Sequence, residues 1–233
     1  MIKTFLILLS FEIFLFASQQ IILVVADDFQ TPKAKLICYE DANQVFEKVE
    51  INLGTNGLAW GLGEVPLTQK VDEPLKYEGD KKSPSGVFKL TDIYGYAKDT
   101  NFSMPYLYAS KELICVDESD SPFYNQIIQK RGDEKSFEYM KRKDNQYELG
   151  IVVAHNKNAS AGRGSCIFVH IKKSQEASTA GCSAMRLDEI QKISAWLDKK
   201  KNPILIQIPK SSSREIINLY PQLKESELLQ EED

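Results

Sequence analysis

The chain has 233 residues, of which 42% are hydrophobic and 27% charged, a composition typical of a globular protein and not of a disordered or fibrous chain. Its formal net charge is -4, and acidic and basic residues are interleaved along most of its length. Because no basic stripe is present to neutralise phosphates, we expect no nucleic-acid partner.

Residues 1–18 predict a signal peptide. Lys3 precedes an apolar run that ends at the small residues Ala17 and Ser18, with Glu12 inside it. The run, roughly a dozen residues, is short for a bilayer span, and a central charge disfavours a permanent anchor. We therefore expect cleavage near Ser18 and a periplasmic or cell-envelope location, with membrane attachment only if the leader stays uncleaved.

Many short apolar runs separated by glycine and proline predict a mainly β domain over residues 19–210. The expected strands are 20–27 and 34–41, which form an opening hairpin, then 87–93, 113–117, 148–156, 165–171 and 203–209. Apolar residues at helical spacing predict one clear amphipathic helix over 185–200, and a second helix is expected near 133–143. Residues 211–233 form a polar, finally acidic tail that is helical or loose.

Four cysteines, Cys38, Cys115, Cys166 and Cys182, allow several pairings in an oxidising compartment. Cys166 lies in an apolar strand and is expected in the core, whereas Cys115 is either structural or paired with Cys38. The chain has no CxxC motif and no His/Cys cluster at zinc spacing, so we expect no metal and no cofactor.

One of only two histidines, His170, ends a predicted strand about a dozen residues before a Gly-Cys pair, Gly181 and Cys182, and a loop of that length can return to its start. A cysteine near pKa ~8.5 needs a histidine or a helix N-terminus to ionise at neutral pH. We expect Cys182 to have both, because the predicted helix begins near Met185. Gly181 permits a sharp turn and leaves room for a substrate carbonyl against the Cys182 N–H.

Two segments in this order resemble the YkuD family of L,D-transpeptidases. FVHIKKSQEASTAGCSAM is similar to the family motif that carries a histidine and a Gly-Cys pair, and GDKKSPSGVFKL is similar to its Gly-Asp-x-x-Thr-Pro-x-Gly-x-Phe segment. The second segment is read as Gly79, Asp80, Ser83, Pro84, Gly86 and Phe88. The resemblance covers residues 50–209 and is strongest to an uncharacterised YkuD-like subgroup.

The resemblance implies a β-sandwich catalytic domain with a few short helices that acts on peptidoglycan stem peptides. It makes Cys182 the nucleophile and His170 the base, with Gly181 and the Cys182 N–H at the oxyanion hole. Ser178 and Thr179 are the candidates for orienting the imidazole. The expected reaction converts a stem tetrapeptide into a Cys182 thioester and then a 3-3 crosslink; the alternatives are an L,D-carboxypeptidase that releases a tripeptide and a noncatalytic wall-binding module.

The sequence departs from the family pattern after the cysteine. The usual arginine two residues on is missing, because Ser183, Ala184 and Met185 follow. Its role in holding anionic substrate groups would pass to Arg163, Arg186 or Lys172, or else the substrate differs. His155 has no counterpart in the family motif and either binds substrate, serves as a second acid/base, or is structural.

Overall fold

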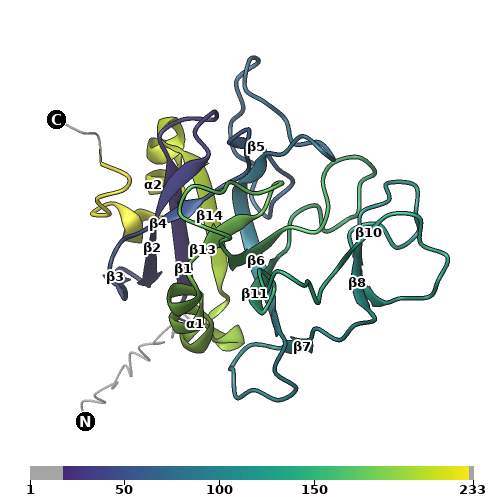
Figure 1. Ribbon diagram of the computed structural model, residues 1–233. Helices are drawn as coiled ribbons and strands as arrows, with labels where there is room; N and C mark the ends of the chain where they lie inside the picture. Colours follow the sequence, from purple (N-terminus) through teal and green to yellow (C-terminus); the bar gives the residue numbers. More distant parts are fainter. Residues whose placement is uncertain (1–17, 231–233) are drawn as a thin grey trace, which may run out of the picture.

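The computed structural model describes residues 18–230 (Figure 1). The described strands are β1 (Gln20–Ala26), β2 (Lys33–Glu40), β3 (Asn43–Gln44), β4 (Val49–Asn52), β5 (Leu58–Trp60), β6 (Ser83–Gly95), β7 (Tyr106–Tyr108), β8 (Leu113–Val116), β9 (Ile127–Gln129), β10 (Phe137–Tyr139), β11 (Leu149–Val153), β12 (Phe168–Ile171), β13 (Ser183–Met185) and β14 (Ile204–Pro209). The α-helices are α1 (Leu187–Trp196) and α2 (Ser213–Leu219), and short 3-10 turns cover Lys199–Lys201, Lys210–Ser212 and Pro221–Leu223.

The large sheet closes on itself and is barrel-like. Its hydrogen-bonded path runs β1-β14-β6-β11-β12-β13-β4-β2, and β2 also pairs with β1. The β1–β2 pair is the antiparallel hairpin predicted from the sequence, and β14 joins β1 in parallel. The mainly β prediction is confirmed, while a sandwich of two facing sheets is not.

The main hydrophobic core lies where the strands turn their apolar residues toward one another. It includes Ile22, Leu36, Ile151, Val169 and Leu205, all at most 2% exposed. Helix α1 packs on this core through its apolar stripe, which comprises Ile190 and Ile193, followed by Leu197 just after the helix. The predicted amphipathic helix is therefore present, although it begins at Leu187.

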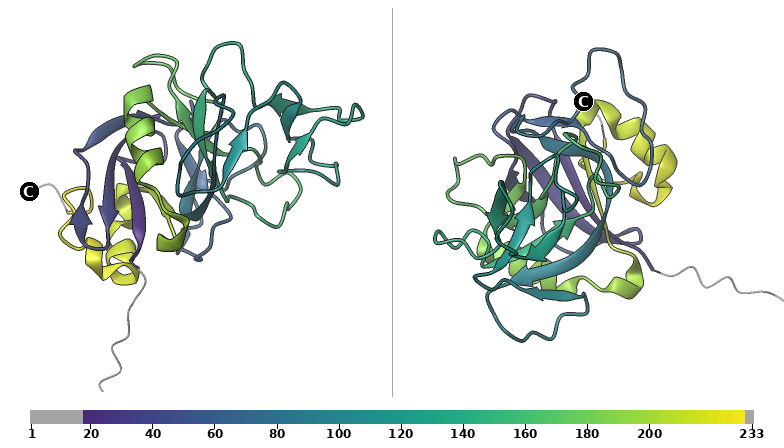
Figure 2. Two further views of the ribbon diagram at one scale, coloured as in Figure 1. Left: turned by 90° about the horizontal axis from the view of Figure 1, so that it is seen from below. Right: turned by 90° about the vertical axis from the view of Figure 1, so that its right-hand side faces the viewer.

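A second core covers the other face of β1 and β14. Ile21, Leu23 and Ile206 pack there against side chains from the C-terminal segment: Ile216, Leu223, Leu228 and Leu229. This segment, yellow in Figures 1 and 2, lies on the side of the barrel opposite the small sheet. The expected tail is thus partly helical, and its apolar residues fasten it to the domain.

A small three-stranded sheet, β10-β8-β9, lies beside the barrel. The helix expected near 133–143 is wrong, because Phe137–Tyr139 pairs with β8 as an antiparallel strand. In this pairing Glu138 lies opposite Cys115. Alternate residues of so short a strand point to opposite faces, so the sheet can present Glu138 on one face while Phe137 and Tyr139 share the other.

The predicted signal peptide lies outside the described residues except for Ser18, so export stays a prediction. Within residues 18–230, the structure contains no helix of the length and apolar character needed for a membrane crossing.

Candidate functional site

Cys182 and His170 come from neighbouring parallel strands. His170 lies in β12, and Cys182 immediately precedes β13, which pairs with β12 in the register Val169↔Ser183 and His170↔Ala184. This pairing puts Cys182 beside Phe168, whose backbone N–H donates to the Cys182 Sγ at 3.3 Å. Because side chains two apart on a strand share a face, Phe168 and His170 project to the same side of β12.

The Cys182 thiol is buried, with 8% of the residue exposed. Its pKa is raised to about 12, mainly by burial and then by the negative charge of Glu138, against the opposing effects of the Phe168 N–H and the Tyr147 hydroxyl. The structure also differs from the expectation that Cys182 sits at a helix N-terminus, because β13 separates it from α1. The thiol is therefore protonated at rest and needs a base when it reacts.

The His170 imidazole is held in a neutral form. Its Nδ1 is 2.9 Å from the carbonyl oxygen of Ile171, an acceptor that assigns the proton to Nδ1 and leaves Nε2 as the basic nitrogen. Burial lowers the pKa of His170 to about 4. Within residues 18–230 no hydrogen bond joins the imidazole to Cys182.

The orienting group for His170 is thus a main-chain carbonyl and not Ser178 or Thr179. Thr179 instead shapes the turn before Cys182: its hydroxyl donates to the Cys182 carbonyl at 2.6 Å and accepts from the Gly181 N–H at 3.1 Å. Ser178 shares a 2.8 Å hydrogen bond with Thr55. Gly181 has φ +149°, a backbone conformation that favours glycine, and the Cys182 N–H has no acceptor in the described part of the chain.

The two sequence motifs meet at the backbone of Cys182. The Ser83 hydroxyl donates to the Cys182 carbonyl oxygen at 2.8 Å and accepts from the Gly54 N–H. Asp80, from the same motif, accepts from the backbone N–H groups of Tyr77 and Lys82 and fixes the turn that precedes Ser83. Both motifs therefore position Cys182, although ninety-nine residues separate Ser83 from it.

Cys182 and His170 line one cleft of about 480 Å³, together with Ser178, Thr179 and Gly181. Charged side chains of both signs line it as well: Lys76, Lys81, Arg142, Lys173, Glu78, Asp117 and Glu138. No sequence motif indicated that Lys76, Arg142, Tyr147 and Glu138 also line this cleft. Arg142 and Glu138 lie in the segment predicted as a helix, so no pattern indicated that their side chains reach the cleft.

The substitutes proposed for the missing arginine lie elsewhere. The Arg163 guanidinium donates to the Lys76 carbonyl at 3.0 Å, and Arg186 pairs with Asp188 and caps α1. Lys172 donates to Gln175. The structure instead puts Arg142 in the cleft, where its guanidinium lies 5.0 Å from the centre of the Tyr147 ring.

His155 is a structural histidine by its contacts. It is 1% exposed, accepts from the Leu62 N–H through Nδ1 at 3.3 Å, and uses Nε2 toward the Arg163 carbonyl at 2.9 Å. It is not among the residues that line the Cys182 cleft. Its hydrogen bonds hold the glycine-containing loop near Leu62 to the segment around Arg163.

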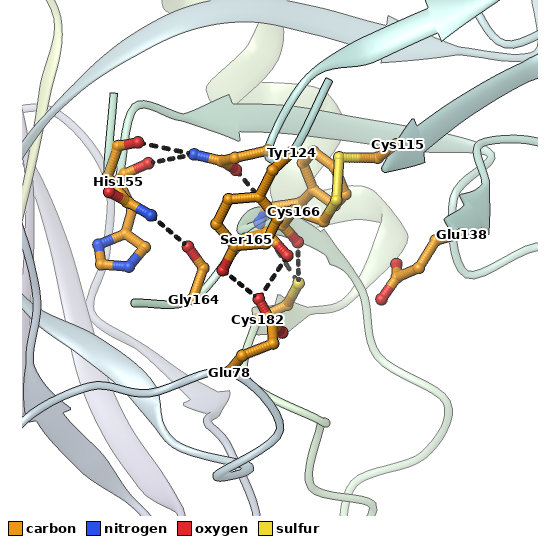
Figure 3. Close-up of a disulfide and its surroundings, with 12 residues drawn as sticks. Glu78, Cys115, Tyr124, Glu138, His155, Gly164, Ser165, Cys166 and Cys182 are labelled. Atoms are coloured by element: carbon orange, nitrogen blue, oxygen red, sulfur yellow. Dashed lines mark hydrogen bonds between the residues drawn. A yellow bond between two sulfur atoms is a disulfide. The ribbon is translucent and has the colours of Figure 1, made fainter. Parts of the chain in front are cut away.

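Cys166 and Cys115 are both buried, as expected of a core residue and a structural residue, but the alternative pairing of Cys115 with Cys38 is wrong. A disulfide joins Cys115 to Cys166, with their Cα atoms 5.9 Å apart, and Cys38 is a free, buried thiol. Cys166 reaches Cys115 because its backbone leaves the extended conformation, at φ +54°. Figure 3 shows the disulfide near Cys182, with Glu138 on the same side of the thiol as Cys115 and Glu78 on the opposite side.

Over residues 18–230, no group of three or more His, Cys, Asp or Glu side chains is arranged to hold a metal ion. Comparison with protein-family models, with curated proteins and with solved structures gave no match.

Proposed function

We propose that this protein is a cysteine acyltransferase that acts on peptidoglycan stem peptides as an L,D-transpeptidase of the YkuD type, exported to the periplasm or cell envelope. The observation that carries the proposal is a buried thiol and a neutral imidazole on adjacent strands of one cleft. The convergence of both family-like motifs on the Cys182 backbone supports it, as does the mainly β architecture.

In the proposed first step, His170 Nε2 takes the proton from the Cys182 thiol as sulfur attacks the substrate carbonyl. A pKa near 12 for the thiol and near 4 for the imidazole mean that the resting pair is uncharged, so proton transfer accompanies attack and no thiolate–imidazolium pair is stored. The Cys182 N–H lies where it can stabilise the oxyanion.

The tetrahedral adduct collapses when the protonated His170 gives its proton to the departing D-amino acid, which leaves a thioester on Cys182. An amine of a second stem peptide then attacks the thioester, His170 accepts its proton, and the thiol is released with a 3-3 crosslink formed. Lys76, Lys81, Lys173 and Arg142 line the same cleft and give it cationic side chains for the carboxylates of a stem peptide, although the Arg142 guanidinium also pairs with Asp144.

The test is intact-protein mass spectrometry of the oxidised protein after incubation with purified disaccharide-tetrapeptide, with parallel analysis of the muropeptides released. We expect an acyl adduct and crosslinked dimers that Cys182→Ala abolishes and that Cys38→Ala retains. Cys38 is the matched control because it is also a free, buried thiol. An adduct that yields tripeptide alone would assign carboxypeptidase activity, and no adduct or product over a range of stem peptides would overturn the proposal in favour of a wall-binding module.

A further inference from the structure

Lys76 is a buried cation to which the resemblance assigns no role. Only 3% of the residue is exposed, and a lysine is rarely buried in proteins unless it is paired. Its ammonium donates to the Tyr77 carbonyl at 2.8 Å and pairs with Asp80 at 2.5 Å. An ammonium has three N–H donors, and within residues 18–230 the third has no acceptor. One donor of a buried charge is therefore available to a ligand.

The Lys76 ammonium lies beside the turn that carries the Cys182 N–H. A Cβ built on Gly181 would lie 3.9 Å from Lys76 Nζ, so the glycine leaves the space between the ammonium and the turn open. Gly164 borders the lysine stem in the same way, since its Cβ would lie 3.1 Å from Lys76 Cε. Lys76, Gly181 and Cys182 all line one cleft. The ammonium is therefore next to the backbone at which we expect the substrate carbonyl.

We propose that Lys76 is a second oxyanion donor, which acts together with the Cys182 N–H during acyl transfer; the inference rests on the proposed function. When Sγ attacks, a C–S bond forms, the C=O π bond breaks, and its electron pair moves to the carbonyl oxygen. Lys76 Nζ and the Cys182 N–H each donate a hydrogen bond to that oxygen. Lys76 keeps its proton throughout, and collapse of the adduct re-forms the carbonyl.

A buried ammonium suits this role because its charge acts where little water is present to screen it. The Asp80 carboxylate balances that charge at rest, so the cation can stay buried. The hydrogen bonds to Tyr77 and Asp80 fix Nζ before the reaction begins. Burial chiefly raises the pKa of the Cys182 thiol, and the positive charge of Lys76 acts against that rise, which agrees with a cation close to the sulfur.

The alternative role of Lys76 is structural, because its hydrogen bonds also hold the turn at Asp80. Two reactions of Cys182 separate these roles. Acylation by p-nitrophenyl acetate passes through an oxyanion, whereas alkylation by iodoacetamide displaces iodide from a saturated carbon and forms no oxyanion. Both reactions use the same thiol. The ratio of the acylation rate to the alkylation rate therefore reports oxyanion stabilisation and cancels changes in the ionisation or accessibility of the thiol.

The experiment measures both rates in a Cys38→Ala background, which leaves Cys182 as the single free thiol. Lys76→Met/Asp80→Asn is compared with Asp80→Asn, so that neither variant has an unpaired carboxylate at position 80. We expect the ratio to fall about 100-fold in the double variant, the usual effect of losing one oxyanion donor. Lys76→Gln/Asp80→Asn, in which two amides can still form a hydrogen bond, is the second variant if the methionine variant lacks a native near-UV spectrum.

Lys201→Met is the matched control, because Lys201 also pairs with a carboxylate, Glu40, but does not line the cleft; its ratio should equal that of the parent protein. An equal ratio in the natively folded double variant and in Asp80→Asn would overturn the inference. Neither reagent is a peptide. A fall in the ratio without any thioester from stem peptides would therefore disprove the proposed function alone, and thioester formation with an unchanged ratio would disprove this inference alone.

Discussion

The Cys182 thiol donates to the carbonyl oxygen of Cys166 at 3.5 Å, and the sulfur of Cys166 is itself bonded to Cys115. The Cys166 N–H in turn donates to the Asn125 side chain at 2.9 Å. The backbone that contacts the Cys182 thiol is therefore tied to the small sheet, which also carries Glu138. The disulfide, like the hydrogen bond from Tyr147 to Glu138, joins the two structural units that line the cleft.

Removal of the disulfide should destabilise the protein. The bond closes a loop of 51 residues, and the chain-entropy model gives a loss of about 4 kcal/mol in the free energy of unfolding for a loop of this length. Urea unfolding of Cys115→Ala/Cys166→Ala against the oxidised wild type measures the loss. In a reducing agent, the urea midpoint of the wild type should approach that of the double variant. Equal midpoints for the oxidised wild type and the double variant would contradict the prediction.

Both histidines should make the fold less stable in mild acid. Burial lowers the pKa of His170 and of His155 to about 4, from 6.5. Since the unfolded chain then binds more protons than the folded one, the stability present above pH 6.5 is lost as pH falls toward 4, by up to about 1.4 kcal/mol per pH unit for each histidine.

The measurement is urea unfolding of wild type and His170→Asn at several pH values. The carboxylates titrate in both proteins, so their contribution cancels in the difference. We expect the variant to lose less stability than wild type between pH 6.5 and 4. Equal pH dependence, or an NMR titration of His170 with a midpoint near 6.5, would show that the imidazole is not desolvated.

The sequence was sufficient for the features that depend on local pattern. The β1–β2 hairpin, β6, β11, β14 and the apolar stripe of α1 follow from alternation, helical spacing and proline or glycine boundaries. The pairing of Cys182 with His170 came from the resemblance and from loop length. Structural features that depend on contacts between segments distant in the sequence could not be predicted from local pattern, because the pattern does not show which segments pair.

The small sheet illustrates that limit. Phe137–Tyr139 has charged and polar neighbours that suit a helix equally well, and only its pairing with β8 makes it a strand. The disulfide has the same origin, because Cys166 reaches Cys115 through a left-handed backbone conformation. Glu138 could not be assigned to the cleft without both facts.

Lys76→Met should be strongly destabilising. Lys76 is 3% exposed and pairs with Asp80 at 2.5 Å, so the substitution leaves a partly buried carboxylate without its counterion, at a cost of about 3–5 kcal/mol. The double variant Lys76→Met/Asp80→Asn should regain part of the lost stability, because the side chain left at position 80 is then uncharged. Thermal unfolding of the two single variants and the double variant gives the coupling; strictly additive losses would argue against the buried pair.

Gly150→Ala should destabilise the packing of the aromatic side chains next to Cys182 and His170. Gly150 lies opposite His170 in the β11–β12 pairing, and an added Cβ would come within 2.2 Å of the Tyr94 ring, which packs on Phe168 and Tyr147. Overpacking of this kind costs about 1–3 kcal/mol. Tyr94→Leu removes the clashing ring atoms, so Gly150→Ala should lower the free energy of unfolding less in that background than in the wild type. A double-mutant cycle measures the difference, and an equal loss in both backgrounds would show that the clash is not with Tyr94.

The C-terminal segment should stabilise the domain through its buried side chains. Ile216 in α2 is fully buried against the outer face of β1 and β14, whereas Leu219 in the same helix is 45% exposed. Ile216→Ala removes apolar area and leaves a cavity, so we expect a loss of about 2–5 kcal/mol in the free energy of unfolding. Leu219→Ala likewise replaces a large aliphatic residue of α2 by alanine, but it removes less buried area. We therefore expect a much smaller loss in the free energy of unfolding. Urea unfolding of both variants makes the comparison, and similar losses would mean that α2 is held by its backbone and not by this apolar contact.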